Sequence, residues 1–131
     1  MSEKYSKKRR IGNVGEGVAV EFLQNKGFVI ITRNYLKPWG EIDIIATKKG
    51  TVRFIEVKSV SREPAEGISR EINDYRPEEM VNASKLRKVS RTAEMYMNDK
   101  RDTRDYQIDV VTVFLDMKNR RAQCKLYEQV L

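Results

Sequence analysis

Histidine is absent from this sequence of 131 residues, and cysteine occurs once, at Cys124. Without histidine the chain can build neither a Ser-His-Asp nor a Cys-His catalytic group, and it offers no imidazole as a general base or metal ligand. A single cysteine excludes an internal disulfide framework and a cysteine-ligated zinc cluster. Any chemistry must therefore rest on carboxylates, lysine, tyrosine or a bound metal ion.

Long apolar runs are also missing from the sequence. None approaches the roughly 18 residues that span a bilayer, and no apolar segment follows the basic N-terminus MSEKYSKKRR as a secretory signal would require. The sequence therefore predicts a cytoplasmic protein without a membrane partner.

Positive charge is what the chain has in excess. Lys and Arg number 26 against 19 Asp and Glu, which gives a formal net charge of +7. This balance favours an acidic polymer as partner, whereas a solvated basic surface is the alternative. The candidate phosphate-binding residues fall into two clusters: Lys7, Lys8, Arg9 and Arg10, and then Arg87, Lys88 and Arg91. For the second cluster, the alternative is a solvated helix face.

Hydrophobic periodicity and turn residues predict the order α-β-β-β-α-β-β. Helices are expected over 11–26, ended by Gly27, and over 77–98. Strands rich in β-branched residues are expected over 28–36, 41–47, 51–60, 106–116 and 122–130. This order predicts one α/β domain over 11–131, with a mixed central sheet flanked by helices. Residues 1–10 are expected to form a basic arm, and residues 61–76 a long mobile loop.

Two carboxylates come together in the expected hairpin GEIDIIATKKGTVRFIEVK, residues 40–58. If Lys49 and Gly50 form its turn, Asp43 lies directly opposite Glu56, and Glu41 lies opposite Lys58. Like charges that face each other across a strand pair repel, so a compensating positive charge is expected nearby. The alternative is a surface hairpin whose charged side chains all point into water.

A divalent metal ion would supply that positive charge. Mg²⁺ binds oxygen ligands, usually one or two carboxylates together with waters and substrate phosphate. Lys58 can position a water molecule or stabilise charge on a phosphate. Glu16 falls within the apolar arc of the first helix and is a candidate third carboxylate, unless it is a half-exposed residue at the edge of that arc.

The sequence resembles the YraN-type family of small bacterial proteins. That family is assigned to the PD-(D/E)xK nuclease superfamily, and it is similar in build to archaeal Holliday junction resolvases. The resemblance covers nearly the whole chain and is carried by these segments: Gly15-Glu16, Ala19, Leu23, Gly27-Phe28, Arg33-Asn34, Gly40-Glu41-Ile42-Asp43, Phe54-Ile55-Glu56-Val57-Lys58, Lys85, Ala93 and Ile108-Asp109-Val110-Val111. It departs from the family at Val60, where an arginine is frequent.

The resemblance implies a metal-dependent nuclease with a restriction-endonuclease-like core. Asp43, Glu56 and Glu16 would bind Mg²⁺, for which Mn²⁺ can substitute, and Lys58 would assist the attacking water. Lys85 would contact the scissile phosphate or pair with Asp109; a structural lysine with an exposed ammonium group is the alternative.

The predicted function is therefore a metal-dependent endonuclease that hydrolyses DNA, with branched or structured DNA among its candidate substrates. The alternatives are a non-catalytic nucleic-acid-binding module on the same fold, and a small-molecule phosphodiesterase or RNA-directed enzyme. A homodimer is compatible with this prediction, because junction resolvases cut two strands symmetrically. Trp39, beside the hairpin, either stacks on a base or plugs the edge of the sheet.

Overall fold

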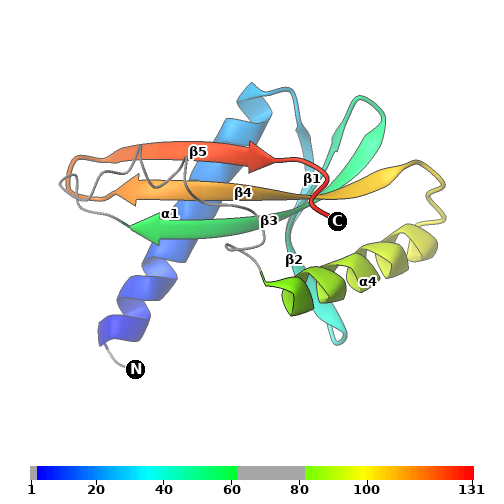
Figure 1. The fold of residues 1–131 in the computed structure, drawn as a ribbon, viewed down its shortest axis with the longest axis horizontal. Helices are drawn as coiled ribbons and strands as arrows, with labels where there is room; N and C mark the ends of the chain where they lie inside the picture. Colours follow the sequence, from blue (N-terminus) through cyan, green and yellow to red (C-terminus); the bar gives the residue numbers. More distant parts are fainter. Residues whose placement is uncertain (1–2, 62–81) are drawn as a thin grey trace.

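The computed structural model describes residues 3–61 and 82–131, with side chains from residue 9 onward (Figure 1). The predicted α/β class and element order are confirmed. The elements are α1 (Glu3–Asn25), β1 (Val29–Lys37), β2 (Gly40–Lys48), β3 (Thr51–Ser61), α4 (Ala83–Asp99), β4 (Tyr106–Asp116) and β5 (Arg121–Tyr127). The loop predicted over 61–76 lies outside the described residues, except for Ser61 at the end of β3. Among the described residues, no helix combines the length and apolarity needed to cross a membrane.

The strands form one mixed sheet in the order β1-β2-β3-β4-β5. β3 and β4 pair in parallel, while the other neighbours pair antiparallel. A parallel pair needs a crossover connection, and α4 lies on the connection between β3 and β4. In Figure 1, β3, β4 and β5 run side by side, whereas β1 and β2 cross the view steeply, as strong sheet twist requires.

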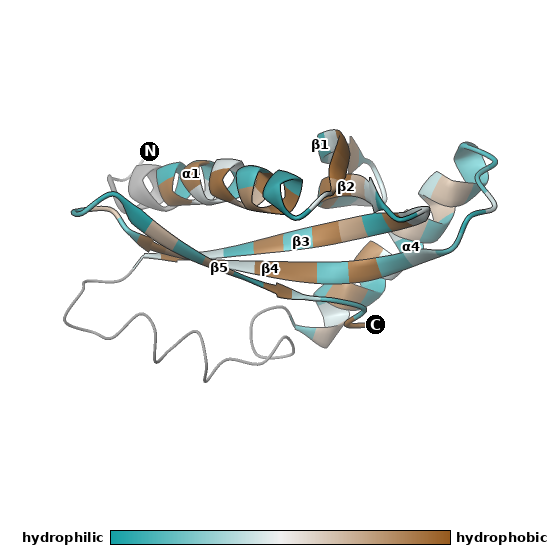
Figure 2. Ribbon diagram, turned by 90° about the horizontal axis from the view of Figure 1, so that it is seen from above, coloured by the Kyte–Doolittle hydropathy of each residue, from teal (hydrophilic) through white to brown (hydrophobic). Residues whose placement is uncertain are grey.

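The two helices bury different faces of this sheet (Figure 2). Neighbouring residues of β3 divide between the faces, because side chains alternate along a strand: Phe54 packs in the α4 cluster and Ile55 in the α1 cluster. The α1 cluster contains Ala19, Leu23, Phe28, Ile44, Ala46, Ile55, Val111, Val113 and Leu115. The α4 cluster contains Ile42, Ile45, Val52, Phe54, Leu86, Val89, Ala93, Tyr96, Met97, Ile108 and Val110.

The helix starts differ from the sequence expectation. α1 begins at Glu3 instead of residue 11, so part of the expected basic arm is helical. Lys, Arg and Glu are good helix formers, and extending an existing helix costs little. α4 begins at Ala83, where the Asn82 side chain accepts a hydrogen bond of 2.8 Å from the backbone N–H of Lys85 and caps the helix. The expected start at residue 77 lies outside the described residues.

Gly15 permits a close contact between α1 and β3. A Cβ atom at this position would lie 1.8 Å from Ser59 Oγ and 2.6 Å from Ser59 Cβ. A larger residue would therefore push α1 off the sheet or displace Ser59. This contact fixes the turn of α1 that carries Glu16.

Gly15→Ala is expected to lower the free energy of unfolding by about 1–3 kcal/mol, as overpacking does, in spite of the better helix propensity of alanine. Gly12→Ala in the same helix is the matched control, because nothing among the described residues lies within 4 Å of a Cβ there. It should raise the free energy of unfolding by up to about 1 kcal/mol. Urea denaturation measures both. Equal effects of the two substitutions would contradict the close contact, and Ser59→Gly should restore most of the loss in Gly15→Ala.

Candidate active site

Asp43 and Glu56, called the acidic pair from here on, lie where the ladder between β2 and β3 ends. The ladder between these strands runs from Lys48–Thr51 to Ile44–Ile55, which is the register predicted from the sequence. Its turn residues Lys49 and Gly50 both have positive φ, 50° and 79°, as a two-residue hairpin turn of this type requires. Asp43 and Glu56 come one step beyond the last ladder pair.

Beyond this point the pairing between β2 and β3 ends, whereas β2 stays paired with β1 and β3 with β4. Glu41 of β2 pairs with Leu36 of β1, and Lys58 of β3 pairs with Thr112 of β4. The prediction that Glu41 faces Lys58 is therefore wrong, because the strands part before they reach these residues. The parting frees the backbone N–H of Val57, which donates a hydrogen bond of 2.8 Å to Asp43 Oδ2 and fixes that carboxylate beside β3.

The carboxylate of Glu56 is buried, and one lysine compensates its charge. Its side chain is 1% exposed, and neither Oε1 nor Oε2 has a hydrogen-bond partner of good geometry among the described residues. The Nζ atom of Lys85, whose side chain is 47% exposed, lies 3.2 Å from Oε2 and forms an ion pair. The positive charge that the sequence required near the acidic pair is therefore supplied, in this structure, by Lys85 of α4.

Burial shifts the protonation equilibria of this group of residues. Burial, and then the charge of Asp43, raise the pKa of Glu56 to about 7, with Lys85 acting in the opposite direction. Burial also raises the pKa of Asp43, although the hydrogen bond from Val57 and the charge of Lys85 oppose the shift. Burial lowers the pKa of Lys85, but the carboxylates of Glu56 and Asp43 outweigh it and raise the pKa overall. Lys85 is therefore held as a cation.

The structure gathers some of the predicted site residues and not others. Glu16 accepts a hydrogen bond of 3.1 Å from Arg33 Nε, yet its charge also contributes to the raised pKa of Asp43. Lys58 is exposed. Over 3–61 and 82–131, no three acidic or thiol side chains form a group that could hold a metal ion. The acidic pair and Lys85 therefore form the centre of the site, with Glu16 nearby but engaged by Arg33.

The suggested pairing of Lys85 with Asp109 is wrong. Asp109 accepts hydrogen bonds of 3.0 Å from Arg53, 2.8 Å from Gln107 and 2.9 Å from the backbone N–H of Gln129. Its neighbour Ile108 belongs to the α4 cluster, so alternation along β4 turns Asp109 toward the opposite face of the sheet. The same alternation could have excluded the pairing at the level of the sequence.

The real partner of Lys85 was missed because no register rule relates a helix to a strand. One signal was available: Lys85 directly precedes Leu86, which begins the buried stripe of α4, so its side chain starts at the edge of the packed interface. A long side chain in that position can reach a buried carboxylate.

The carboxylates fit a hard divalent cation. Mg²⁺ commonly binds one or two carboxylates and completes its shell with water and phosphate oxygens. Buried side-chain oxygens that lack a hydrogen bond of good geometry, as in Glu56, are rare in folded proteins, and here the half-exposed ammonium group of Lys85, 3.2 Å from Oε2, is the ion-pair partner among the described residues. Asp43 and Glu56 can therefore hold such an ion, provided that the ammonium group of Lys85 moves aside.

A cavity of about 480 Å³ opens beside Lys85, and Lys88 of the same helix also lines it. Its lining residues are Gly40, Glu41, Asn82, Ser84, Lys85, Lys88 and Val89. Arg87, Lys88 and Arg91 are exposed on α4, and Arg9 and Arg10 are exposed on α1; the side chains of Lys7 and Lys8 lie outside the described residues. Of these cations, only those of α4 belong to the same helix as Lys85.

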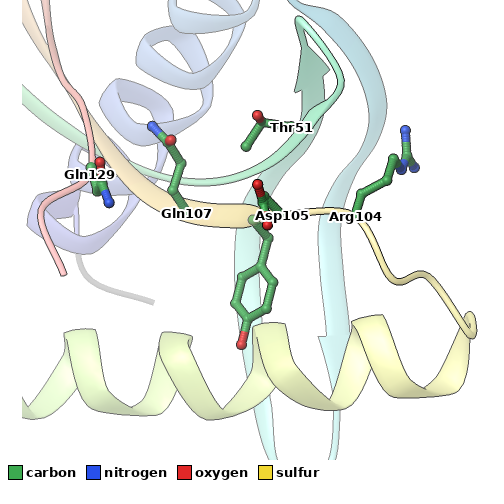
Figure 3. Close-up of a pocket in the computed structure, with 6 residues that line it drawn as sticks. Thr51, Arg104, Asp105, Gln107 and Gln129 are labelled. Carbon is green, nitrogen blue, oxygen red and sulfur yellow. The ribbon is translucent and has the colours of Figure 1, made fainter.

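A second polar cavity, of about 460 Å³, is lined by neither residue of the acidic pair (Figure 3). Thr51 places it at the turn end of β3, and Arg104 within it is held by Asp102, with 2.6 Å between Nη2 and Oδ2. Its lining residues are Thr51, Arg104, Asp105, Tyr106, Gln107 and Gln129. With its one cation already paired, this cavity offers no comparable chemistry.

The pKa of Glu56 gives the stability of the protein a specific pH dependence. Because this pKa is raised from 4.5 to about 7, the folded state binds the proton more tightly than the unfolded state. The resulting stabilisation is present at acidic pH and is lost as the pH rises through 7. In EDTA, the free energy of unfolding is expected to fall between pH 5 and pH 8, by at most about 3 kcal/mol.

Glu56→Gln should flatten this dependence, while Lys85→Met should steepen it, since Glu56 then loses its counter-charge. Glu94→Gln, at an exposed position of α4, is the control and should follow the wild type. Urea denaturation at several pH values provides the measurement. Parallel curves for wild type and Glu56→Gln would show that Glu56 is not the titrating group.

Comparison with known proteins places the chain in a family. The uncharacterised protein family UPF0102 matches residues 15–113, a span that contains Glu16, the acidic pair and Lys85. A UPF0102 protein of Caldicellulosiruptor saccharolyticus is 37% identical over 113 residues, which are 86% of this chain and 88% of that protein. A UPF0102 protein of Dictyoglomus turgidum is 33% identical over 111 residues, which are 84% of this chain and 86% of that protein. One of Fervidobacterium nodosum is 36% identical over 132 residues, 98% and 86% of the two chains. The protein therefore belongs to the UPF0102 family, which is the YraN-type family that its sequence resembles.

Proposed function

We propose that this protein is a metal-dependent endonuclease that hydrolyses phosphodiester bonds in DNA, with a core of the PD-(D/E)xK type similar to that of archaeal Holliday junction resolvases. The observation that carries the proposal is the buried carboxylate of Glu56, which lies beside Asp43 where the β2–β3 ladder ends and whose ion-pair partner among the described residues is the half-exposed ammonium group of Lys85, 3.2 Å away. A protein without a use for a cation has little reason to bury two acids together.

Asp43 and Glu56 are the residues that would hold Mg²⁺ or Mn²⁺. A divalent ion bound there supplies Lewis acidity toward a phosphoryl oxygen and acidifies a bound water. The Val57 N–H keeps the carboxylate of Asp43 oriented toward β3. Glu16 would join the carboxylates once Arg33 releases it.

Lys58 is the candidate for handling the attacking water. It follows Glu56 by two residues on β3, so alternation directs both side chains to the same face of the sheet, and its ammonium group is exposed to an incoming phosphate. Its charge can hold a hydroxide or a phosphoryl oxygen in place during hydrolysis.

A non-catalytic nucleic-acid-binding module is the second candidate function. The ion pair between Lys85 and Glu56 favours it, because Lys85 already compensates the buried charge without a metal. In that case the basic residues of α4 would bind phosphates, and the acidic pair would serve to anchor α4 against the sheet.

Cleavage of labelled duplex, single-stranded and four-way-junction DNA distinguishes these functions. Wild type is expected to cut at least one of these DNAs in Mg²⁺ or Mn²⁺ and none in EDTA. Asp43→Asn should reduce the rate by at least about 100-fold, since it removes a metal ligand and a charge. Glu94→Gln, which removes an exposed carboxylate elsewhere on α4, should retain the wild-type rate.

DNA that is bound at low salt but not cut in either metal would support the binding module instead. Equal rates for wild type and Asp43→Asn would point to a contaminating nuclease and overturn the assignment of the acidic pair.

The basic face of α4 predicts a local contribution to salt dependence. Each phosphate contact adds roughly 0.9 to the slope of log K against log salt concentration for duplex DNA. Lys88→Ala should therefore reduce the slope by about 1, whereas Lys118→Ala, an equal loss of charge at the exposed turn after β4, should leave it nearly unchanged. Fluorescence anisotropy over a series of salt concentrations measures both slopes. Identical reductions would mean that net charge, and not α4, governs binding.

A further inference from the structure

An exposed tryptophan stands at the turn that leads into the acidic pair. Trp39 directly precedes β2 and is 45% exposed, which favours the surface alternative over a plug at the edge of the sheet. It is the only tryptophan in the chain. An exposed indole ring offers a flat face on which a base can stack, so its surroundings decide whether it is a binding residue.

Trp39 lines a shallow cavity of about 430 Å³ between the β1–β2 hairpin and α4. One wall is rigid, because the ring of Tyr35 packs edge to face against the buried Tyr96, with 5.3 Å between ring centroids. The rim carries one cation, because Lys37 Nζ lies 5.6 Å from the centroid of the Tyr35 ring, and one anion, Asp99. The lining residues are Tyr35, Lys37, Trp39, Met95, Asn98 and Asp99.

Gly40, the residue after Trp39, fixes the position of the β1–β2 hairpin relative to α4. A Cβ atom on Gly40 would lie 2.3 Å from Thr92 Oγ1, so the hairpin and the helix are in close contact here. Gly40 also lines the cavity beside Lys85, so consecutive residues, Trp39 and Gly40, contribute to the two cavities. The Cα atoms of Trp39 and Asp43 are four residues apart and therefore at most about 14 Å distant. That distance corresponds to about four nucleotides at a rise of about 3.4 Å.

The lining of the Trp39 cavity suits a base better than a phosphate. Aromatic rings and the thioether of Met95 offer stacking and apolar contact, whereas the carboxylate of Asp99 repels a phosphate. Asn98 and Asp99 can instead accept hydrogen bonds from the edge of a base. In a continuous duplex each base is stacked between its neighbours, and freeing one costs a few kcal/mol.

We infer that Trp39, together with Tyr35 and Met95, is a stacking platform for an unpaired base within about four nucleotides of the phosphate at the acidic pair. The platform directs the protein to DNA that contains a single-stranded tail, flap or branch. This inference rests on the proposed function and adds the substrate class to it.

The single tryptophan allows a direct test. Protein in EDTA, which prevents metal-dependent cutting, is titrated with a duplex that carries a single-stranded tail and with a blunt duplex of the same length. Stacking should quench the fluorescence of Trp39 with the tailed DNA and leave it nearly unchanged with the blunt DNA. Trp39→Ala should weaken binding of the tailed DNA at least about fivefold, with less than twofold effect on the blunt duplex.

Two further variants control for structure. Trp39→Phe keeps an aromatic face and should retain most of the affinity for the tailed DNA. Leu36→Ala removes an apolar side chain that is 72% exposed in the same hairpin but has no aromatic face, and it should bind both DNAs as the wild type does. Equal affinity of wild type and Trp39→Ala for the tailed DNA, or an equal loss with both DNAs, would overturn the inference. So would a dimer that dissociates in Trp39→Ala with unchanged DNA affinity, because the residue would then belong to a protein interface.

The outcomes separate this inference from the proposed function. Quenching and tail preference without cleavage in Mg²⁺ or Mn²⁺ would support the platform and refute catalysis. Cleavage that Trp39→Ala leaves unchanged on every DNA would support catalysis and refute the platform.

Discussion

The buried charge of Glu56 is the constraint on which the rest of the site depends. An isolated carboxylate in a protein interior costs several kcal/mol, so it must take up a proton or acquire a counter-charge. Here a lysine at the start of α4 supplies that charge at 3.2 Å, and the cap formed by Asn82 sets where the helix, and therefore Lys85, begins. This ion pair thereby connects β3 with the start of α4, which are distant in the sequence.

The same arrangement leaves room for exchange of the counter-ion. The buried stripe of α4, with Leu86 and Val89, holds the helix on the sheet independently of Lys85. The lysine side chain is half exposed and flexible, so it can leave Glu56 without loss of the fold when a metal ion or a phosphate takes its place. The acidic pair is thus accompanied by a cation that can be displaced, as the proposed metal binding requires.

α4 connects the core, the acidic pair and the proposed nucleic-acid surface. Its apolar side packs on β2 and β3, Thr92 lies close to Gly40 in the β1–β2 hairpin, and Lys88 lines the cavity beside Lys85. On the opposite face, the contact of Gly15 with Ser59 places Glu16 where its charge acts on Asp43. The UPF0102 family match extends over all of these positions.

The sequence by itself determined the element order, the two-residue turn at Lys49 and Gly50, and the register of the β2–β3 hairpin, because these follow from short-range periodicity and turn chemistry. Only the tertiary structure decided that the β2–β3 ladder ends at Ile44–Ile55, while β2 continues to pair with β1 and β3 with β4. It also decided the partners of the charged residues: Lys85 with Glu56, Glu16 with Arg33, and Asp109 with Arg53. Such pairs depend on how helices and strands dock through the core, and no local pattern of residues specifies that docking.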